Sequence, residues 1–224
     1  EAWQQAIASH DATLTTGSDP INAQVLGAQP RLKIAANMAV GFNNFDVPAM
    51  TGLGVIASNT PDVLTETTAD FGFALMMATA RRMTESEHYL RAGLWKQWRY
   101  DMFAGAEVHG STLGIFGEGV LGQATAQIAR ALGMKVLFAD HAPPKADGVD
   151  FVPPEQVFAE SDIISLHCPL TPASRHFIGM AQLQQMKRSA LLINTSRGGL
   201  VDEDALKTAL QTGASTIIAS GKES

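Results

Sequence analysis

The sequence has almost no cysteine: among 224 residues there is one, Cys168. A single thiol excludes an internal disulfide, and no second cysteine stands near it to complete the spacing of a zinc site. This composition suits a reducing compartment, so we expect a cytoplasmic protein that binds no metal ion. Because Cys168 directly precedes Pro169, we interpret it as a buried or loop thiol rather than as a nucleophile.

Long apolar runs and long charged runs are also missing. The longest apolar run, residues 71–80, is about half of what a membrane span requires. No basic stretch with a cleavable apolar segment stands at the front. The net charge of −6 is spread without blocks, which argues against nucleic acid as a partner. An apolar content of 46% and a charged content of 17% are those of a globular protein, for which we expect neither a membrane nor a nucleic-acid partner.

One stretch, residues 112–140, predicts a strand, a glycine loop, a helix and a second strand. An apolar run leads into the loop Gly117–Gly122, which reads Gly-Glu-Gly-Val-Leu-Gly. Apolar residues then recur at the three- and four-residue spacing of a helix face, and Gly133 ends that pattern as a C-terminal cap would. A second apolar run, 135–139, ends in Asp140. This order is typical of a dinucleotide-binding unit.

Each loop residue has a physical role if a dinucleotide lies on this turn. Gly117 allows the tight turn, Gly119 lets the backbone approach a pyrophosphate, and Gly122 lets the helix pack on the strand. The backbone N–H groups near Val120 and Leu121 would face the phosphates, with the helix dipole behind them. The alternative is a glycine-rich turn that binds nothing.

Asp140 follows Gly122 by 18 residues, about where an acid accepts hydrogen bonds from the adenosine ribose. An aspartate at the end of a strand can also be only a loop residue or a cap. We therefore predict a ribose contact for Asp140 as one of two interpretations.

Two further strands are predicted at 162–166 and 189–194, and polar residues follow both. The segments His167–Thr171 and Thr195–Arg197 come directly after them. Ligands of parallel α/β sheets bind beyond the carboxyl ends of the strands, so these segments and the glycine loop should converge. Arg197 is the permanent cation in that set and could hold a carboxylate with its two-pronged guanidinium. The alternative for Arg197 is a surface ion pair.

The first third of the chain alternates short strands and helices, which predicts a small parallel α/β layer. Asp19 followed by Pro20 predicts the start of a helix over residues 21–26. A helix over 63–82 is apolar nearly all round, as expected between two layers, and we place a domain boundary within it. The aromatic, basic loop 95–100 is interpreted as a surface that packs on a partner subunit rather than on nucleic acid.

At this point the sequence resembles the D-isomer-specific 2-hydroxyacid dehydrogenases, and within them the glyoxylate and hydroxypyruvate reductase branch. The resemblance extends over about residues 12–213 and is carried by ordered motifs. These motifs are NMAVGFNNFD at 37–46, NTPDVLTETTA at 59–69, LGIFGEGVLG at 113–122, HCPLT at 167–171 and INTSRGGLVDEDAL at 193–206.

The resemblance implies an α/β protein of two domains, each a parallel sheet with helices on both faces, and an active site in the cleft. The expected division is a partial flavodoxin-like substrate domain over residues 1–75 and a Rossmann NAD-binding domain over residues 76–224. The Rossmann domain should lack its last strands, so we expect a truncated chain.

The resemblance also implies hydride transfer between NAD(P)H and C2 of a small 2-oxo acid. Arg197 matches the catalytic arginine that binds the carboxylate and carbonyl, and Val40 and Gly41 match the loop whose amides hold the substrate carboxylate. The residues matched to cofactor contacts are Gly117, Gly119, Val120, Leu121, Gly122, Asp140, Cys168, Pro169, Thr195 and Ser196.

For the cofactor and the assembly the resemblance gives three expectations. An acid at Asp140 would repel a 2′-phosphate, so NAD is favoured and NADP is the alternative. A homodimer is expected. Trp98 resembles a loop tryptophan that in the reductase branch reaches the substrate cleft of the neighbouring subunit.

The chain departs from the family pattern at the general acid, which is a histidine in a His-Ile-Gly motif paired with a glutamate. None of the six histidines stands in that motif, and His167 lies in the cofactor stretch instead. Two alternatives therefore stay open beside a reductase. The chain could be a catalytically inactive NAD(H)-binding relative that acts as a sensor or interaction module, or a remnant that does not fold.

Overall fold

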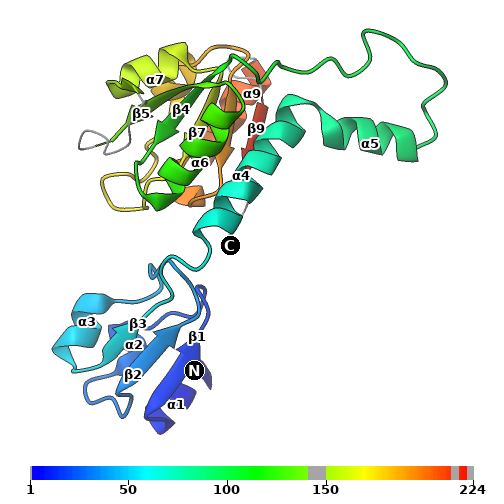
Figure 1. Ribbon diagram of the computed structural model, residues 1–224. Coiled ribbons are helices and arrows are strands. Elements are labelled where there is room, and N and C mark those ends of the chain that lie inside the picture. The colour runs from blue at the N-terminus through cyan, green and yellow to red at the C-terminus, as the bar shows by residue number, and fades with distance from the viewer. Residues whose placement is uncertain (1, 141–149, 213–216, 221–224) are drawn as a thin grey trace. The chain divides into compact units, whose positions relative to one another are not determined.

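The computed structural model describes residues 2–140, 150–212 and 217–220, and it divides the chain into two compact units (Figure 1). The first unit is Glu1–Leu64 and the second is Thr65–Ser224. The division falls at the start of the long helix α4 (Thr65–Ala80), whereas the sequence placed the boundary inside that helix, after residue 75.

The first unit is a three-stranded parallel sheet in the order β1-β2-β3, with helices that pack on one apolar core. That core includes Ile21, Ala35 and Met50, all of them fully buried. On these strands Leu14, Ile34 and Ile56 are exposed. The elements are α1 (Ala2–Ser9), β1 (Ala12–Thr15), α2 (Ala23–Leu26), β2 (Ile34–Asn37), α3 (Val47–Gly52) and β3 (Ile56–Ser58).

The prediction of a helix from residue 21 is wrong at its start. Asn22, not Asp19, is the N-cap of α2, because its Oδ1 accepts a hydrogen bond of 3.0 Å from the backbone N–H of Val25. Ile21 is fully buried and forms an isolated parallel bridge with Phe45, so it is extended. Asp19 instead accepts hydrogen bonds from Thr16.

The second unit is a six-stranded parallel sheet in the order β6-β5-β4-β7-β8-β9, with helices on both faces (Figure 1). After α4 the elements are α5 (Met83–Arg91), β4 (Thr112–Phe116), α6 (Val120–Ala131), β5 (Lys135–Ala139), β6 (Asp150–Phe151), α7 (Pro154–Glu160), β7 (Ile163–Leu166), α8 (Met180–Gln185), β8 (Leu191–Asn194), a 3₁₀ turn (Gly198–Leu200), α9 (Glu203–Thr212) and β9 (Ile217–Ser220).

Two apolar cores cover the two faces of this sheet. One contains Phe73 and Met76 of α4 and Ala126 of α6. The other contains Val157 of α7 and Leu183 of α8. Strands β4, β7 and β8 contribute to both cores, since their burial is continuous rather than alternating, as expected for parallel strands covered on both sides. The central strands are paired in parallel register, and that register positions the loops at their ends.

Helix α5 differs from its neighbours, because none of its nine residues is buried. Exposed aromatic side chains follow it along the chain, with 76% of Trp98 and 87% of Tyr100 accessible. None of the described helices is long and apolar enough to cross a membrane.

Candidate functional site

Strand register brings four loops to one edge of the sheet of the second unit. Phe116 of β4 pairs with Ala139 of β5 and with Leu166 of β7, which in turn pairs with Asn194 of β8. These four residues are the last of their strands. The residues that follow them, Gly117, Asp140, His167 and Thr195, therefore leave the sheet side by side. The convergence expected from the sequence is present in the structure.

The glycine loop is folded against both the helix behind it and the end of β7. Gly117 has a φ of +99°, and a Cβ atom there would lie 2.8 Å from the backbone nitrogen of Cys168. A Cβ atom on Gly122 would lie 2.1 Å from the carbonyl oxygen of Gly117. At Gly119, by contrast, a Cβ atom would meet no described atom within 4 Å. The packing of the chain therefore requires glycine at positions 117 and 122, whereas Gly119 faces open space.

Helix α6 begins at this open space. Gly119 is its N-cap, and no side chain of the described residues caps it. Val120 and Leu121 form its first turn, and Val120 is 57% exposed. The start of a helix presents backbone N–H groups and the positive end of the helix dipole, which favour an anion. The loop and α6 therefore form a surface that can receive a phosphate group.

Asp140 is tied to the glycine loop. Its Oδ2 accepts a hydrogen bond of 2.6 Å from the backbone N–H of Glu118. Asp140 itself is exposed, and Glu118 is half-buried. The carboxylate thus lies at the rim of the loop, where an acid can accept hydrogen bonds from a ribose.

The segment after β7 is linked to the segment after β8. Ser196 Oγ donates a hydrogen bond of 2.8 Å to the carbonyl oxygen of Cys168, and the carbonyl of Pro169 accepts one of 2.7 Å from Ser174 Oγ. Burial raises the pKa of the half-buried Cys168 thiol, and the Asp140 carboxylate raises it further. A thiol with a raised pKa is a poor nucleophile near neutral pH, in agreement with the interpretation of Cys168 as a buried or loop thiol rather than as a nucleophile.

A buried asparagine shapes the turn that carries Arg197. Asn194 accepts a hydrogen bond of 3.1 Å from the N–H of Ser196 and donates one of 2.9 Å to the carbonyl of Arg197. Arg197 Nη1 donates to the carbonyl of Ser196 at 2.9 Å, which folds the half-buried side chain back over the turn. The guanidinium is therefore held at the end of β8 by the fold of its own loop.

Thr195, the first residue of that loop, lies against helix α4. A Cβ atom on Gly72 of α4 would meet Thr195 Oγ1 at 3.5 Å, which is ordinary contact. Helix α4 therefore packs on this sheet at the end of β8.

His167 is held by its own strand. Its Nε2 lies 2.9 Å from Oγ of the buried Ser165, two residues earlier. Burial lowers the pKa of His167 to about 4, so the imidazole is neutral near pH 7. The backbone N–H of His167 donates to the carbonyl of Phe116 and extends the pairing of β4 and β7 by one residue.

Val40 and Gly41 belong to the first unit. They lie in the loop after β2, where Asn37 Nδ2 donates to the carbonyl of Gly41 at 2.9 Å and Asn59 Nδ2 donates to the carbonyl of Val40 at 2.8 Å. Asn37 is buried and accepts a hydrogen bond from Thr15. The loop is fixed by asparagine side chains that hold its carbonyl groups.

Asn37, Asn194 and Glu118 are the residues at these loops that motif matching did not single out. The available signal for the asparagines was their position as the last residue of a strand, where an amide side chain can bond to the turn that follows. Glu118 gave no signal, because its contact is with a residue 22 positions away.

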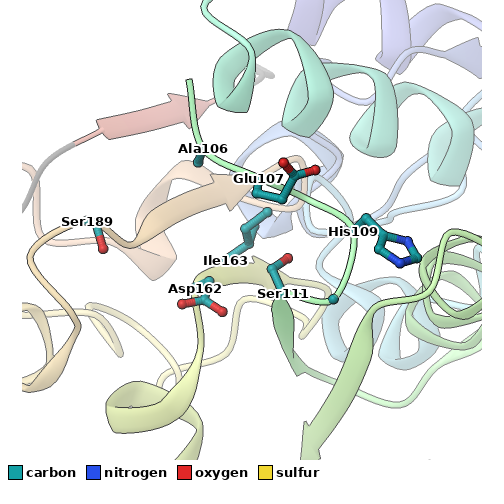
Figure 2. A pocket seen from close by; sticks show the side chains of 8 residues that line it. Ala106, Glu107, His109, Ser111, Asp162, Ile163 and Ser189 are labelled. Carbon is teal, nitrogen blue, oxygen red and sulfur yellow. The ribbon is translucent and has the colours of Figure 1, made fainter. Parts of the chain in front are cut away.

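A cavity of about 360 Å³ lies at the opposite edge of the same sheet, near the amino ends of β4 and β7. Figure 2 shows its lining, which includes Glu107, His109, Ser111 and Asp162. It is remote from the carboxyl ends of the strands and contains none of the residues predicted for the site. Within residues 2–140, 150–212 and 217–220, no group of three His, Cys, Asp or Glu side chains could hold a metal ion.

Known proteins are similar to this chain in sequence and in fold. Residues 73–220 match the family model of the D-isomer specific 2-hydroxyacid dehydrogenase NAD binding domain. The chain is 49% identical to a glyoxylate reductase of Korarchaeum cryptofilum over 208 residues, which cover 91% of this chain and 63% of that protein. The chain thus spans less than two thirds of the length of that relative.

Solved structures agree with the family match. The TT0316 protein of Thermus thermophilus superimposes with a TM-score of 0.89 at 36% identity, over 97% of this chain and 70% of that one. D-lactate dehydrogenase of Aquifex aeolicus, complexed with NAD and lactic acid, has a TM-score of 0.88 at 28% identity, over 97% of this chain and 66% of that one. The chain belongs to the D-isomer specific 2-hydroxyacid dehydrogenase family, and residues 73–220 form its NAD binding domain.

Proposed function

We propose that this chain is the major part of an NAD-dependent reductase that transfers a hydride between NADH and C2 of a small 2-oxo acid, with glyoxylate or hydroxypyruvate as substrate. The observation that carries the proposal is the in-register ending of β4, β5, β7 and β8, which gathers the glycine loop, Asp140 and the Arg197 turn at one edge of a sheet. The relative from Korarchaeum cryptofilum, named a glyoxylate reductase, supports the choice of substrate.

The residues present fit a bound dinucleotide. Open space at Gly119 admits a pyrophosphate, the start of α6 supplies N–H groups, and the exposed Asp140 can accept hydrogen bonds from the ribose. Cys168, Pro169, Thr195 and Ser196 would line the rest of the cofactor along the strand ends. NADH, when bound, supplies the hydride.

On the substrate side, Arg197 would bind the carboxylate of the 2-oxo acid and draw electron density from its carbonyl oxygen. A guanidinium suits this role, because it is permanently charged and presents parallel N–H donors. Backbone amides of Val40 and Gly41 would bind the carboxylate as well. Asn37 and Asn59 hold the carbonyl groups of these two residues, so the loop need not reorganise when it binds an anion.

His167 would not be the proton donor for the alkoxide. With a pKa of about 4 and its Nε2 engaged with Ser165, its imidazole has no acidic proton to give near neutral pH. Its role in this scheme is to pack at the cofactor edge.

NADP is the alternative cofactor, and the carboxylate of Asp140 argues for NAD.

The proposal also includes a cytoplasmic homodimer. A single cysteine suits the cytoplasm. The exposed side chains of Leu90 in α5 and of Trp98 and Tyr100 after it are large and apolar or aromatic, and such side chains are often buried between subunits. If they are buried in this way, the double variant Trp98→Ser, Tyr100→Ser will shift sedimentation from dimer to monomer without loss of helical content; an unchanged dimer contradicts the assignment of this surface.

The test of the enzymatic proposal is the oxidation of NADH by glyoxylate and hydroxypyruvate, with NADH affinity measured separately by calorimetry. The chain is compared with the longest open reading frame that contains it. In the active protein Arg197→Ala is expected to lower kcat/KM about 10²–10³-fold, while NADH affinity changes less than about twofold. Arg197→Lys keeps the charge but not the fork and should lie between.

Turnover that is unaffected by Arg197→Ala would overturn the role of Arg197. NADH binding with no turnover in either protein would instead favour the second candidate, an NAD(H)-binding module that senses the cofactor or binds a partner. The second candidate is supported by the same geometry, because the glycine loop and Asp140 could bind NADH whether or not the chain catalyses a reaction.

A further inference from the structure

Beside Asp140 there is a second acid at the cofactor edge, and no role has been assigned to it. Glu118 stands between Gly117 and Gly119 in the glycine loop, and its backbone N–H donates to Asp140 Oδ2 at 2.6 Å. The two acidic residues are thus in direct contact, one at the end of β4 and one at the end of β5. Neither side chain is buried.

Helix α6 fixes the position of Glu118. Gln123 Nε2 donates to the carbonyl oxygen of Glu118 at 3.0 Å and lies 3.4 Å from its Oε1. The residue is therefore braced at its N–H by Asp140 and at its carbonyl by Gln123. Its carboxylate stays at the loop and does not extend freely into solvent.

The basic residues of α6 and β5 lie at the ends of these elements that are remote from the glycine loop. Arg130 stands in the last turn of α6, and Lys135 is the first residue of β5. Both are a full element length from the glycine loop. Among the residues that the structure describes, this loop and the end of β5 contribute two acidic side chains, those of Glu118 and Asp140.

We propose that Glu118 is a second determinant of cofactor choice, which acts with Asp140 to disfavour a dinucleotide that carries a 2′-phosphate. This inference rests on the proposed function, because it assumes that the adenosine ribose lies at Asp140. A phosphate monoester carries a charge of nearly −2 at neutral pH, and NAD has a neutral hydroxyl group at that position. Two carboxylates repel the phosphate more than one, and they leave the hydroxyl group unaffected by charge.

The test is the affinity of the full chain for NADH and NADPH, measured by calorimetry, and for NAD⁺ and NADP⁺ as competitors that displace fluorescent NADH. Glu118→Gln removes one charge and keeps an oxygen that can accept from Gln123. We expect it to strengthen NADPH and NADP⁺ binding about 3- to 10-fold and to change NADH binding less than about twofold. Asp140→Asn should strengthen NADPH binding by at least as much, and the two effects should multiply in the double variant.

Glu107→Gln is the matched control. It makes the same change of charge at the opposite edge of the sheet, where Glu107 lines the cavity in Figure 2. It should alter neither affinity. Because the effect of Glu118 is electrostatic, the gain in NADPH affinity should also shrink as salt is raised from about 0.05 to 0.5 M.

A purely structural role for Glu118 would change NADH and NADPH affinity by the same factor, and that result overturns the inference. An unchanged NADPH affinity in Glu118→Gln overturns it as well. If the unaltered chain binds neither NADH nor NADPH, the proposed function fails, and the inference fails with it. If NADH binds and only the change of preference is missing, the proposed function stands and the inference alone is wrong.

Discussion

A Cβ atom on Gly122 would lie 2.1 Å from the carbonyl oxygen of Gly117. The first turn of α6 therefore packs directly on the loop that precedes it, with no room for a side chain between them. Gly117 is confined in turn by the end of β7, since its φ of +99° and the backbone nitrogen of Cys168 both exclude a side chain. The shape of the loop is fixed from behind and from the side, and only the face at Gly119 is open.

Two glycine variants should separate packing from binding. Gly122→Ala places a methyl group against backbone that cannot move cheaply, so we expect a loss of about 1–3 kcal/mol in the free energy of unfolding. Gly119→Ala meets no described atom and has an ordinary φ of −62°, so its stability should change by less than about 0.5 kcal/mol. Its methyl group would occupy the space where a phosphate approaches, so NADH affinity should fall.

Urea unfolding followed by circular dichroism measures the first effect, and NADH calorimetry measures the second. Equal losses of stability in the two variants would contradict the distinction. So would a Gly119→Ala chain that binds NADH as tightly as the unaltered chain does.

The convergence of the loops at the carboxyl ends of the strands could be predicted from the sequence, because each loop is marked by a signal within a few neighbouring residues. An apolar run followed by polar residues marks the end of a strand, and the ends of parallel strands share an edge. Gly117, Asp140, His167 and Thr195 each follow such a run, and the structure brings all four together. The cap of α9 is equally local, because Asp202 directly precedes the helix and its Oδ1 accepts from the N–H of Ala205.

Contacts between distant positions could not be predicted in this way. The bond from Glu118 to Asp140 depends on the register of β4 and β5, which no local pattern specifies. Similarly, Asp19 with Pro20 is a good local signal for a helix start, but Ile21 is drawn into a buried bridge with Phe45. Tertiary burial moved the start of α2 to Asn22, whose side chain also makes a good cap.

His167 should titrate near pH 4 in the folded chain, because burial penalises the charged imidazole. This value is lower than the 6.5 of a solvated histidine, so the unfolded chain takes up a proton between the two values while the folded chain does not. His167 therefore makes the folded state less stable as pH falls from about 6.5 to 4, and it adds no pH dependence above that window.

Proton NMR of the imidazole groups checks this, with the signal assigned by its loss in His167→Gln. Ser165→Ala is the informative companion, because it removes the hydrogen bond to Nε2 and leaves the half-buried ring in the same surroundings. The pKa should stay low in that variant. A midpoint near 6.5 in the unaltered chain would show that the ring is solvated and would remove the argument against His167 as a proton donor.

Cys168 should react slowly with a disulfide reagent such as DTNB. It is the only cysteine, so the reaction reports on one site. Burial and the Asp140 carboxylate raise the pKa of the thiol, and the thiolate is the reactive form. At pH 8 we expect the folded chain to react at least about tenfold more slowly than the chain unfolded in urea, and Asp140→Asn to react somewhat faster than the unaltered chain. Cys168→Ser gives the blank. Equal rates for the folded and unfolded chains would contradict the raised pKa.

Asp162 should stabilise the opposite edge of the sheet in a pH-dependent way. Its Oδ2 accepts from the N–H of Thr112 at 2.9 Å, and its Oδ1 accepts from Lys187 Nζ at 2.7 Å, so it joins β4 and β7 to the segment before β8. Burial alone would raise the pKa of Asp162, but the hydrogen bonds from Lys187 and Thr112 outweigh it and lower the pKa below 3.8.

A pKa that is lower in the folded state stabilises the fold above the unfolded value and loses that contribution as pH falls through the folded value. Asp162→Asn should therefore lower the free energy of unfolding by about 0.5–1 kcal/mol at pH 7. The effect is small because the side chains of Asp162 and Lys187 are both 38% exposed, so solvent screens their ion pair. The difference from the unaltered chain should shrink as the pH falls below 3.8 and disappear below the folded-state pKa of Asp162. Asp11→Asn, which breaks the more exposed pair with Arg31, should have a smaller effect. Urea unfolding at a series of pH values from 7 downward measures this, and a difference that does not shrink as the pH falls below 3.8 would mean that Asp162 acts through packing rather than through its charge.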